Sequence, residues 1–364
     1  MAETALSRDA VYTARPTVRI DGQPNAQLDE LMVAMEMTET EGGMSALELT
    51  VQNTQPGEGG GPSGLAWEGG DVLALGKAIA IYSGDEREPR EVFRGVITGL
   101  EGVWPLDGAP ELVVLAEDAL QRARMARRTA VHENAKISDL AGALASRLSL
   151  TPVITGLTDG LGTQVQMNES DLAFLRRLLA DRDADLQVVG TELHVSPRGD
   201  VRRGTVELEM RPTGQLLAAR ALADLSHQAT EVTATGWDPA QGARISASST
   251  GAHAGPGSGQ KGADALREAL GERKEHVREL AVLNDAEARA LADAFFDQRA
   301  RRFVTVEATA QGNPAIRVGT HVTLKGMGPR FDNTYYVVRC THRFDPQDGY
   351  MTHFEGECAF LGQG

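Results

Sequence analysis

Apolar and polar residues alternate with a period of two from Thr17 to Ala116, which is the spacing of half-buried β-strands. In the segment SALELTVQN, Leu47, Leu49 and Val51 fall on one face and polar residues on the other. The segments LMVAMEM, KAIAIYSG, VFRGVITGLEGVW and APELVVLAE alternate in the same way, and QPGEGGGPSGLAWEGG breaks the pattern as a loop. Short strands at this spacing predict a β-barrel domain over residues 17–118, after an N-terminal extension of residues 1–16.

Helical spacing replaces the alternation from Glu117 onward. The segments AEDALQRARMARRTAV and KISDLAGALASRLSL both place apolar residues three and four apart. In the second segment Ser138 is the predicted N-cap, and Leu140, Leu144 and Leu148 form the apolar face.

A third helix is predicted in NESDLAFLRRLLADRDADLQVV, capped by Asn168 or Ser170. Arg176, Arg177, Asp181 and Asp183 are predicted to face mostly solvent. The following segment, DLQVVGTELHVSP, reads as a hairpin with its turn near Gly190. Residues 119–205 are therefore predicted to form an α+β middle region.

A second β block is predicted over residues 206–362. The segments VELEMRP, ATEVTATGWDP, ARISASS, FVTVEATA, GTHVTLKG, TYYVVRCTHRF and YMTHFEGECAF alternate, and the last two form a hairpin over DPQDG. A flexible linker and a helical insertion interrupt this block at about 251–303, where Asn284 or Asp285 caps the longest helix. The two β blocks are similar in size, so the predicted fold class is mainly β with α+β parts and a duplicated barrel.

The charge balance narrows the classes of function. The chain has 51 Asp and Glu against 36 Lys and Arg, a net charge of −15. This balance argues against binding to nucleic acid through neutralised phosphates. No apolar stretch reaches the roughly 20 residues of a membrane span. The N-terminal segment has no apolar core of a signal peptide, so we expect a chain made in the cytoplasm, without membrane insertion.

Sequence motifs for cofactors and metals are weak. GPGSGQKG at 255–262 resembles a phosphate-binding loop, but Gly262 follows Lys261 where Ser or Thr is required, so a linker is favoured. His342 and His353 flank the terminal hairpin without a third ligand, and two partly exposed histidines are favoured over a metal site. Cys340 and Cys358 are predicted to be buried, reduced thiols. We expect no cofactor and no metal.

Acidic and basic clusters leave alternatives open. Glu169 with Asp171, and Asp181 with Asp183 and Asp185, include enough carboxylates for a glycosidase. Glu169 and Asp171 also fit the first turn of a helix, where the helix dipole favours acids. The arginine clusters at 121–128, 198–203 and 299–303 either lie on solvated helix faces beside acids or face an acidic partner subunit.

The segment at 168–189 resembles the baseplate hub proteins of contractile injection machines. These are the late control protein D family of phage tails and the hub part of the VgrG spike proteins. The resemblance rests on a polar, acidic turn that leads into a helix with an aromatic residue and paired leucines. The matching positions are Asn168, Glu169, Asp171, Leu172, Phe174, Leu175, Leu178 and Leu179.

The C-terminal region is similar to the closing barrel of the same family. A Gly-x-Pro turn and Gly319 precede a strand that ends at Gly326, and two further strands follow. The matching positions in those strands are Tyr336, Val338, His342, Gly349, Tyr350, Thr352 and Phe354. The similarity extends from about Thr17 to Phe360.

The resemblance implies a structural, non-enzymatic homotrimer that adapts a sixfold inner tube to a threefold spike. Its implied partners are further copies of itself, a separate spike protein, the inner-tube or tube-initiator protein, and baseplate wedge or adapter proteins. VgrG chains continue into an oligonucleotide-fold domain and a needle, whereas this sequence ends at Gly364, so the spike is expected on another chain. The particle containing this baseplate would be a phage tail or a phage-tail-like machine.

Two alternatives remain at this point. One is a cell-wall-degrading glycosidase, which would need a matched pair of acids in a cleft. The other is a carbohydrate-binding tail component, which would need exposed aromatic side chains, and the chain has only three Trp and five Tyr.

Overall fold

The computed structural model describes residues 15–55, 64–83, 89–212, 214–238, 241–277, 282 and 284–362. It is a β-rich molecule with a few helices, which confirms the predicted mainly β class with α+β parts. In its described residues the first β block has one short helix and seven strands. These are β1 (Thr17–Ile20), β2 (Gln23–Pro24), α2 (Ala26–Leu31), β3 (Met32–Thr40), β4 (Ala46–Gln52), β5 (Ala78–Ser83), β6 (Arg90–Val103) and β7 (Glu111–Glu117).

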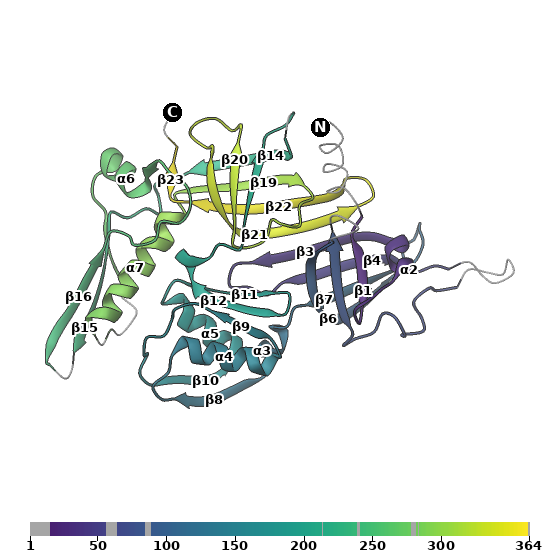
Figure 1. Ribbon diagram of the computed structural model, residues 1–364, viewed down its shortest axis with the longest axis horizontal. Helices are drawn as coiled ribbons and strands as arrows, with labels where there is room; N and C mark the ends of the chain where they lie inside the picture. Colours follow the sequence, from purple (N-terminus) through teal and green to yellow (C-terminus); the bar gives the residue numbers. More distant parts are fainter. Residues whose placement is uncertain are drawn as a thin grey trace.

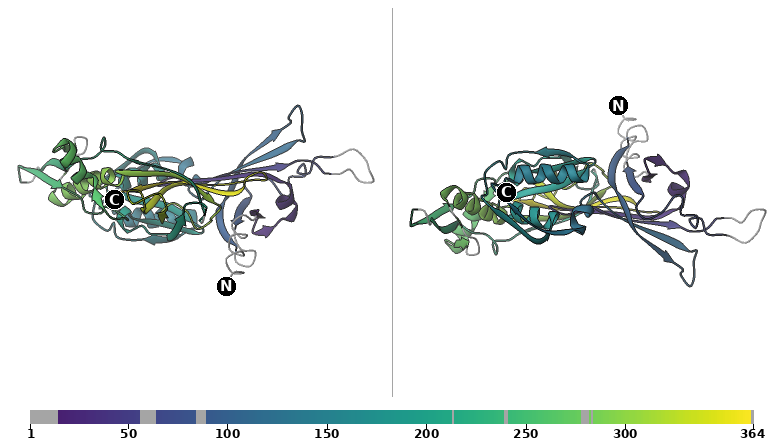
Figure 2. Two further views of the ribbon diagram at one scale, coloured as in Figure 1. Left: turned by 90° about the horizontal axis from the view of Figure 1, so that it is seen from above. Right: turned by 90° about the horizontal axis from the view of Figure 1, so that it is seen from below.

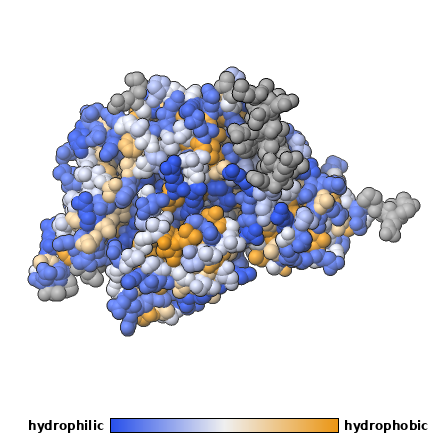
Figure 3. All heavy atoms as spheres, in the orientation of Figure 1, coloured by the Kyte–Doolittle hydropathy of each residue, from blue (hydrophilic) through white to orange (hydrophobic). Residues whose placement is uncertain are grey.

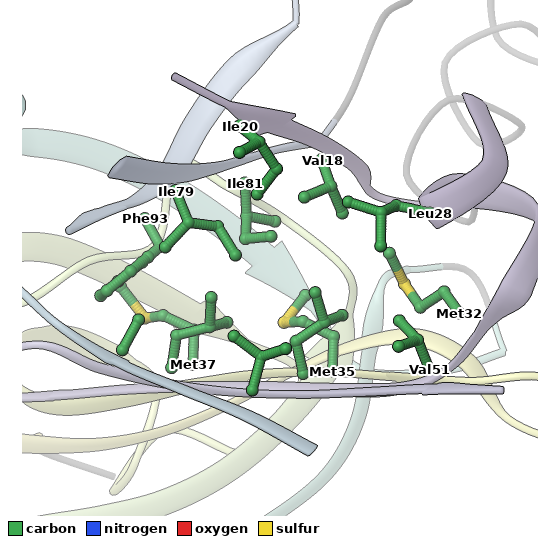
Figure 4. Close-up of a cluster of buried hydrophobic side chains, with 14 of the residues drawn as sticks. Val18, Ile20, Leu28, Met32, Met35, Met37, Val51, Ile79, Ile81 and Phe93 are labelled. Atoms are coloured by element: carbon green, nitrogen blue, oxygen red, sulfur yellow. The ribbon is translucent and has the colours of Figure 1, made fainter. Parts of the chain in front are cut away.

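The core of the first β block follows directly from the alternation in sequence. In β4, Leu47, Leu49 and Val51 are buried, and the residues between them face outward. Figure 4 shows side chains of β1 and β5 opposite those of β3, with Met35 and Met37 closing the space between the two layers. Burial of such apolar side chains contributes roughly 1.5–3 kcal/mol each.

The middle block follows, with helices packed on two small sheets. Its elements are α3 (Gln121–Met125), β8 (Arg127–His132), α4 (Ile137–Leu148), β9 (Thr151–Ile154), β10 (Gln164–Ser170), α5 (Asp171–Ala180), β11 (Ala184–Val189), β12 (Glu192–Pro197) and the 3₁₀ turn η2 (Arg198–Asp200). Strands β11 and β12 form the predicted hairpin, with Gly190 at φ 60° in its turn.

Two predictions for the middle block were wrong in detail, and a third was confirmed. The helix predicted over AEDALQRARMARRTAV is only α3, because the chain leaves it at Ala126 and pairs as β8 with β10. Helix α4 begins at Ile137 with Lys136 at the N-cap, so Ser138 lies inside the helix. For α5 the N-cap is Ser170, one of the two predicted candidates, whose side chain accepts a hydrogen bond from the Ala173 N–H.

The second β block contains β13 (Gly204–Glu209), β14 (Leu216–Ala223), β19 (Val304–Gln311), β20 (Thr320–Lys325), β21 (Asn333–Asp345), β22 (Gly349–Cys358) and β23 (Phe360–Leu361). The predicted terminal hairpin is β21–β22. Strand β14 was missed, because its sequence LLAARALA is rich in alanine and has little apolar–polar contrast.

The two β blocks form one 13-stranded sheet rather than two separate barrels. Its main path runs β14-β19-β22-β21-β3-β4-β7-β6-β5-β1-β2, with β20 and β13 branching from β21. The link between the blocks is the antiparallel pairing of β21 with β3. Among the described residues the main path does not return to its start, and in the second block only a single bridge, Met210 with Leu216, links the end of β13 to the start of β14. The prediction of closed barrels is therefore corrected to two curved halves of a continuous sheet.

An insertion lies between β14 and β19 and is α+β rather than helical. It contains β15 (Glu231–Asp238), β16 (Ala243–Ser249), β17 (Gln260–Lys261), α6 (Gly262–Leu270), β18 (Lys274–Val277) and α7 (Asp285–Arg301). Asn284 caps α7 as predicted, and α7 packs on the sheet formed by β15, β16 and β18. Helix α6 ends at Gly271, whose φ of 89° allows the turn into β18.

The segment predicted as a flexible linker is held by specific contacts. The Asp297 carboxylate accepts hydrogen bonds from the N–H groups of Ala252 and His253 at 3.0 and 2.9 Å. Further along, the N–H of Ser258 donates to the Asn333 side-chain oxygen at 3.0 Å. These bonds fasten the segment to α7 and β21, so the prediction of a free linker was wrong.

The molecule is elongated, with the insertion at one end and the first β block at the other (Figures 1 and 2). The middle block lies beside the long sheet near the point where its two halves meet. On the face in Figure 3, apolar patches over the second β block and the middle block are separated by a hydrophilic band. The domain boundaries predicted at residues 118, 205 and 251–303 remain a proposal.

Candidate interface and buried charge junction

The acids at the start of α5 are engaged by arginines of the same block. The Glu169 carboxylate accepts two hydrogen bonds from Arg177, at 3.1 and 3.0 Å, and this contact lowers the pKa of Glu169. Asp171 lies 2.7 Å from Arg128 and 2.9 Å from Arg147. These two predicted positions thus stabilise the first turn of α5 and tie it to β8 and α4.

The apolar side of α5 forms the core of the middle block. Phe174, Leu175 and Leu178 are 3 %, 2 % and 5 % exposed. The Phe174 ring stacks on His132 of β8, with their centroids 5.0 Å apart. The three residues lie inside the block, so any effect on an interface would pass through the fold of the block.

Two predicted residues of the terminal hairpin, Tyr350 and Thr352, contact a third, the buried His342. The Tyr350 hydroxyl lies 2.8 Å from His342 Nδ1, and the Thr352 hydroxyl lies 3.3 Å from the same atom. His342 Nε2 is 2.9 Å from the Ile316 carbonyl oxygen, so the ring is neutral with its proton on Nε2. Burial, followed by the nearby Arg317 charge, lowers the pKa of His342 to about 4. His342 was predicted to be partly exposed and is fully buried.

The predicted glycines occupy left-handed backbone positions. Gly319, Gly326 and Gly349 have φ of 86°, 85° and 73°. Gly349 lies in the turn of the terminal hairpin, where a side chain would meet open space. Gly319 is crowded, because a Cβ there would lie 2.5 Å from Arg203 Nη1.

Cys340, Cys358 and His353 are held within the fold. Cys340 and Cys358 are free and buried, as predicted. His353 is half-buried, with Nδ1 2.9 Å from the Thr309 hydroxyl. Within the described part of the chain, no group of three or more His, Cys, Asp or Glu side chains has the arrangement of a metal site.

Buried ion pairs join the three blocks, and sequence reasoning missed them. Glu39 of β3 is 1 % exposed and accepts hydrogen bonds from Arg317 Nε at 2.8 Å and from the Val318 N–H at 2.6 Å. Burial alone would raise the pKa of Glu39, but Arg317 and the Val318 N–H hold it below its ordinary value. This pair fastens the first β block to the loop before β20.

Two aspartates at the start of β11 make the corresponding contacts for the middle block. Asp185 is buried and pairs with Arg203, just before β13. Asp183 pairs with Arg301 at the end of α7 through hydrogen bonds of 2.8 and 2.5 Å. Asp183 was predicted to face solvent and is only 14 % exposed at its side chain.

Arg198 lies at the centre of this junction with its side chain 4 % exposed. Its guanidinium pairs with Glu41 and lies 3.7 Å from Glu357 of β22. It also covers the ring of Tyr336, with 3.0 Å between the guanidinium carbon and the ring centroid. Arg198 therefore joins η2, the β3–β4 turn and β22 at one point.

Such a junction fixes the relative positions of the blocks. Removing one partner of a buried ion pair leaves an unpaired charge in a poorly hydrated site and costs about 3–5 kcal/mol. The arginines of these contacts belong to the clusters noted at 198–203 and 299–303. Their acidic partners could not be identified from the sequence, because they lie far away along the chain. Of the two alternatives for these clusters, pairing within the chain describes Arg198, Arg203 and Arg301.

Two edges of the sheet are open in the described part of the chain. Strand β14 pairs along its length with β19, and on its other edge only Leu216 makes a bridge, to Met210, so that edge of Ala218–Ala223 has no strand partner among the described residues. Strand β6 pairs with β5 only up to Val96, which leaves one edge of Thr98–Val103 open. Both edges carry exposed apolar side chains, Leu222 at 52 % and Leu100 at 39 %. Proteins normally protect such edges, so open apolar ones mark sites for pairing.

Solved structures of similar fold are phage tail and secretion proteins. The 43 kDa tail protein of prophage MuSo2 from Shewanella oneidensis gives a TM-score of 0.68 at 14 % identity, covering 94 % of this chain and 97 % of that one. The tail protein from Neisseria meningitidis MC58 gives a TM-score of 0.65 at 12 % identity, covering 94 % and 96 %.

A third structure is the c3393 protein of E. coli, described as a component of the type VI secretion system with similarity to the T4 bacteriophage tail proteins gp27 and gp5. It gives a TM-score of 0.59 at 10 % identity, covering 95 % of this chain and 79 % of that one. At such identities these likenesses show the fold. No curated protein matches the chain.

The described helices include none with the length and apolar character needed to cross a membrane. The match to a family model covers residues 65–345, most of the chain, and the family is described as the Alg8 N-terminal domain. The chain belongs to the Alg8 N-terminal domain family.

Proposed function

We propose that this protein is a structural hub in the baseplate of a contractile tail or injection particle. It acts as a homotrimer that adapts a sixfold inner tube to a threefold spike, as in the late control protein D family. Its partners are the spike, the inner-tube or tube-initiator protein and the surrounding baseplate proteins. The chain is made in the bacterial cytoplasm and incorporated into the particle.

The observation that supports the proposal is the continuous sheet to which both β blocks contribute. Each β block supplies a curved half, and the β3–β21 pairing joins the halves side by side. Three such chains present six similar curved units around one axis, which is the geometry of an adapter between sixfold and threefold partners. The likeness in fold to phage tail proteins over nearly the whole chain supports this arrangement.

The open sheet edges support assembly from several copies. A ring of identical chains needs two different edges on each copy, one to pair with each neighbour. The open edges of β14 and β6 lie far apart along the sheet path and are similar in length. Pairing of β14 with β6 of the next copy would continue the sheet around the ring and cover both edges.

Four of the five acids considered for catalysis form ion pairs within the chain. Glu169 and Asp171 pair with Arg177 and with Arg128 and Arg147, and Asp183 and Asp185 pair with Arg301 and Arg203. A glycosidase needs one protonated and one free carboxylate facing each other across a substrate. The observed pairings favour the structural role.

The test is the mass of the purified chain by light scattering, alone and with a candidate spike protein. The expected result is a trimer of 38.9 kDa chains that captures a spike trimer. Hydrogen exchange then compares the trimer with the dissociated chain. The amides of Ala218–Ala223 and Thr98–Val103 should gain protection in the trimer, whereas those of β22, paired on both sides, should not change.

A stable monomer that ignores the spike would contradict the proposal. Hydrolysis of purified cell wall by that monomer would instead support the glycosidase alternative. Neither result depends on the exact domain boundaries.

A further inference from the structure

A polar cavity of about 280 Å³ lies where the two β blocks and the middle block meet. Its charged lining consists of Glu39, Arg90, Glu91, Arg203 and Arg317. The remaining lining includes Gln187 and Val189 of β11 and the backbone near Pro314. The cavity is therefore built from three separate parts of the sequence.

Gln187 is the unusual member of this lining. Its side chain is 1 % exposed, and neither its amide nitrogen nor its amide oxygen has a hydrogen-bond partner in the described protein. Leu186 and Val188 point into the core of the middle block, so Gln187 is on the opposite face of β11, toward the cavity. An unsatisfied buried amide destabilises the fold, and a ligand with matching groups would remove that cost.

Two arginines also present unused donors. Arg203 uses its terminal nitrogens on Asp185 and on the Val318 carbonyl oxygen, but its buried Nε has no partner. Arg317 binds Glu39 through Nε and Nη2, while its Nη1 makes only a 3.5 Å contact with the Glu91 carbonyl oxygen. Unused donors therefore come from Arg203, Arg317 and Gln187.

The charges around the cavity favour an anion. Both Glu39 oxygens are already occupied by Arg317 and Val318, and Glu91 is held by Arg94 and Tyr82. The lining thus has three arginines, Arg90, Arg203 and Arg317, against two acids. Arg203 and Arg317 are already paired with Asp185 and Glu39, so the excess of positive charge in the lining is that of one arginine. Arginine donors match a planar carboxylate, which can accept two parallel hydrogen bonds.

We propose that this cavity binds a carboxylate through Arg317, Arg203 and Gln187. The carboxylate comes either from a small free acid or from an acidic side chain of a second copy of the chain. The Gln187 amide nitrogen donates to it, and the Gln187 oxygen accepts from a donor next to the carboxylate. Nothing in the proposed hub function requires this site, and the two proposals fail separately.

The test is isothermal calorimetry with succinate, using succinamide as the neutral analogue and sodium chloride at matched ionic strength. Binding of succinate but not succinamide to both the assembled and the dissociated protein indicates a free acid as the ligand. Binding only to the dissociated chain indicates that a carboxylate of a second copy occupies the cavity after assembly. Absence of succinate binding in both states overturns the proposal.

Two variants of Gln187 make the test specific. Gln187→Leu keeps the side chain's size and should weaken succinate binding at least about tenfold, because it removes the amide. Gln187→Glu places a carboxylate beside the two arginines, so it should abolish succinate binding and raise the unfolding temperature of the ligand-free protein. Undiminished succinate binding by both variants would contradict the assignment of Gln187.

A matched control is Gln311→Leu. The Gln311 Oε1 atom is also buried without a partner, but Gln311 lies on β19 and does not line the cavity. This variant should bind succinate as the unmodified protein does. Light scattering of each variant establishes whether its assembly is intact, so loss of the carboxylate site is distinguished from loss of the trimer.

Discussion

The guanidinium of Arg301 holds both carboxylate oxygens of Asp183, at 2.8 and 2.5 Å, although the two residues are 118 positions apart. Their side chains are 6 % and 14 % exposed. This contact joins the insertion to the middle block and is one member of the buried charge junction. Its energetic role can be measured separately from the others.

Asp183→Asn should destabilise the protein by about 3–5 kcal/mol, because it leaves the Arg301 charge buried without its partner. The measurement is urea unfolding followed by circular dichroism. The double variant Asp183→Asn with Arg301→Met removes both charges and should recover a large part of the loss. A double variant whose loss equals the sum of the single losses would show that the two side chains are not coupled.

His342→Asn should make the stability of the protein less sensitive to acid. In the folded protein the pKa of His342 is lowered to about 4 by burial and by Arg317, against 6.5 in an unfolded chain. Between these pH values the unfolded chain binds a proton that the folded protein excludes, so stability falls as the pH falls. This pKa difference lowers the free energy of unfolding by about 3 kcal/mol at pH 4. The variant lacks the histidine, so it should not show this loss.

Other groups also titrate in this range, so the measured quantity is the difference between variant and unmodified protein. Burial raises the pKa of Asp118 to about 6, which works in the opposite direction as the pH falls. The control is His353→Asn, since His353 is only half-buried. Equal acid sensitivity of His342→Asn and the unmodified protein would contradict the role given to His342.

Leu175→Asp or Leu178→Asp should abolish soluble trimer. Both leucines are buried in the core of the middle block, and an aspartate there would be an unpaired charge in an apolar site. Light scattering and sedimentation of the expressed protein test this. The matched control is Ala173→Asp, an exposed position in the first turn of the same helix where an acid is favourable. A normal trimer from Leu175→Asp would refute the placement of α5.

Gly319→Ala should cost more stability than Gly349→Ala. Both positions have positive φ, so alanine is strained by about 1 kcal/mol at each. At Gly319 the new methyl group would also displace the Arg203 guanidinium that pairs with Asp185, whereas at Gly349 it meets open space. Urea unfolding of the two variants gives the comparison, and equal losses would show that Arg203 moves without cost.

The local sequence pattern predicted the elements in which apolar and polar residues alternate clearly or a capping residue stands at the helix start. The alternation of Leu47, Leu49 and Val51 gave β4 and its buried face, and Asn284 marked the start of α7. The prediction failed where apolar and polar residues alternate weakly, or where pairing with a distant strand determines the secondary structure. The segment from Arg127 to His132 looks helical beside α3, yet it becomes β8 because β10 offers it a partner.

The junction was harder to predict because its pairs are distant in sequence. Arg317 and Glu39 are 278 positions apart, and no local rule connects them. The clusters at 198–203 and 299–303 showed that arginines gather there, but solvent exposure is the common fate of such clusters. Similarly, the glycine-rich segment at 250–262 has a loop's composition, and only its contacts with Asp297 and Asn333 show that it is fixed.

The β3–β21 pairing also sets the order in which the protein can fold. The hydroxyls of Thr38 and Thr341 meet at 3.3 Å across this pairing, 303 positions apart. During synthesis, β3 leaves the ribosome long before its partner exists, so one of its edges stays unpaired while most of the chain is translated. Contacts this distant slow folding and expose strand edges to aggregation. Yield in the cell should therefore depend on chaperones that protect the first half until the last hairpin arrives.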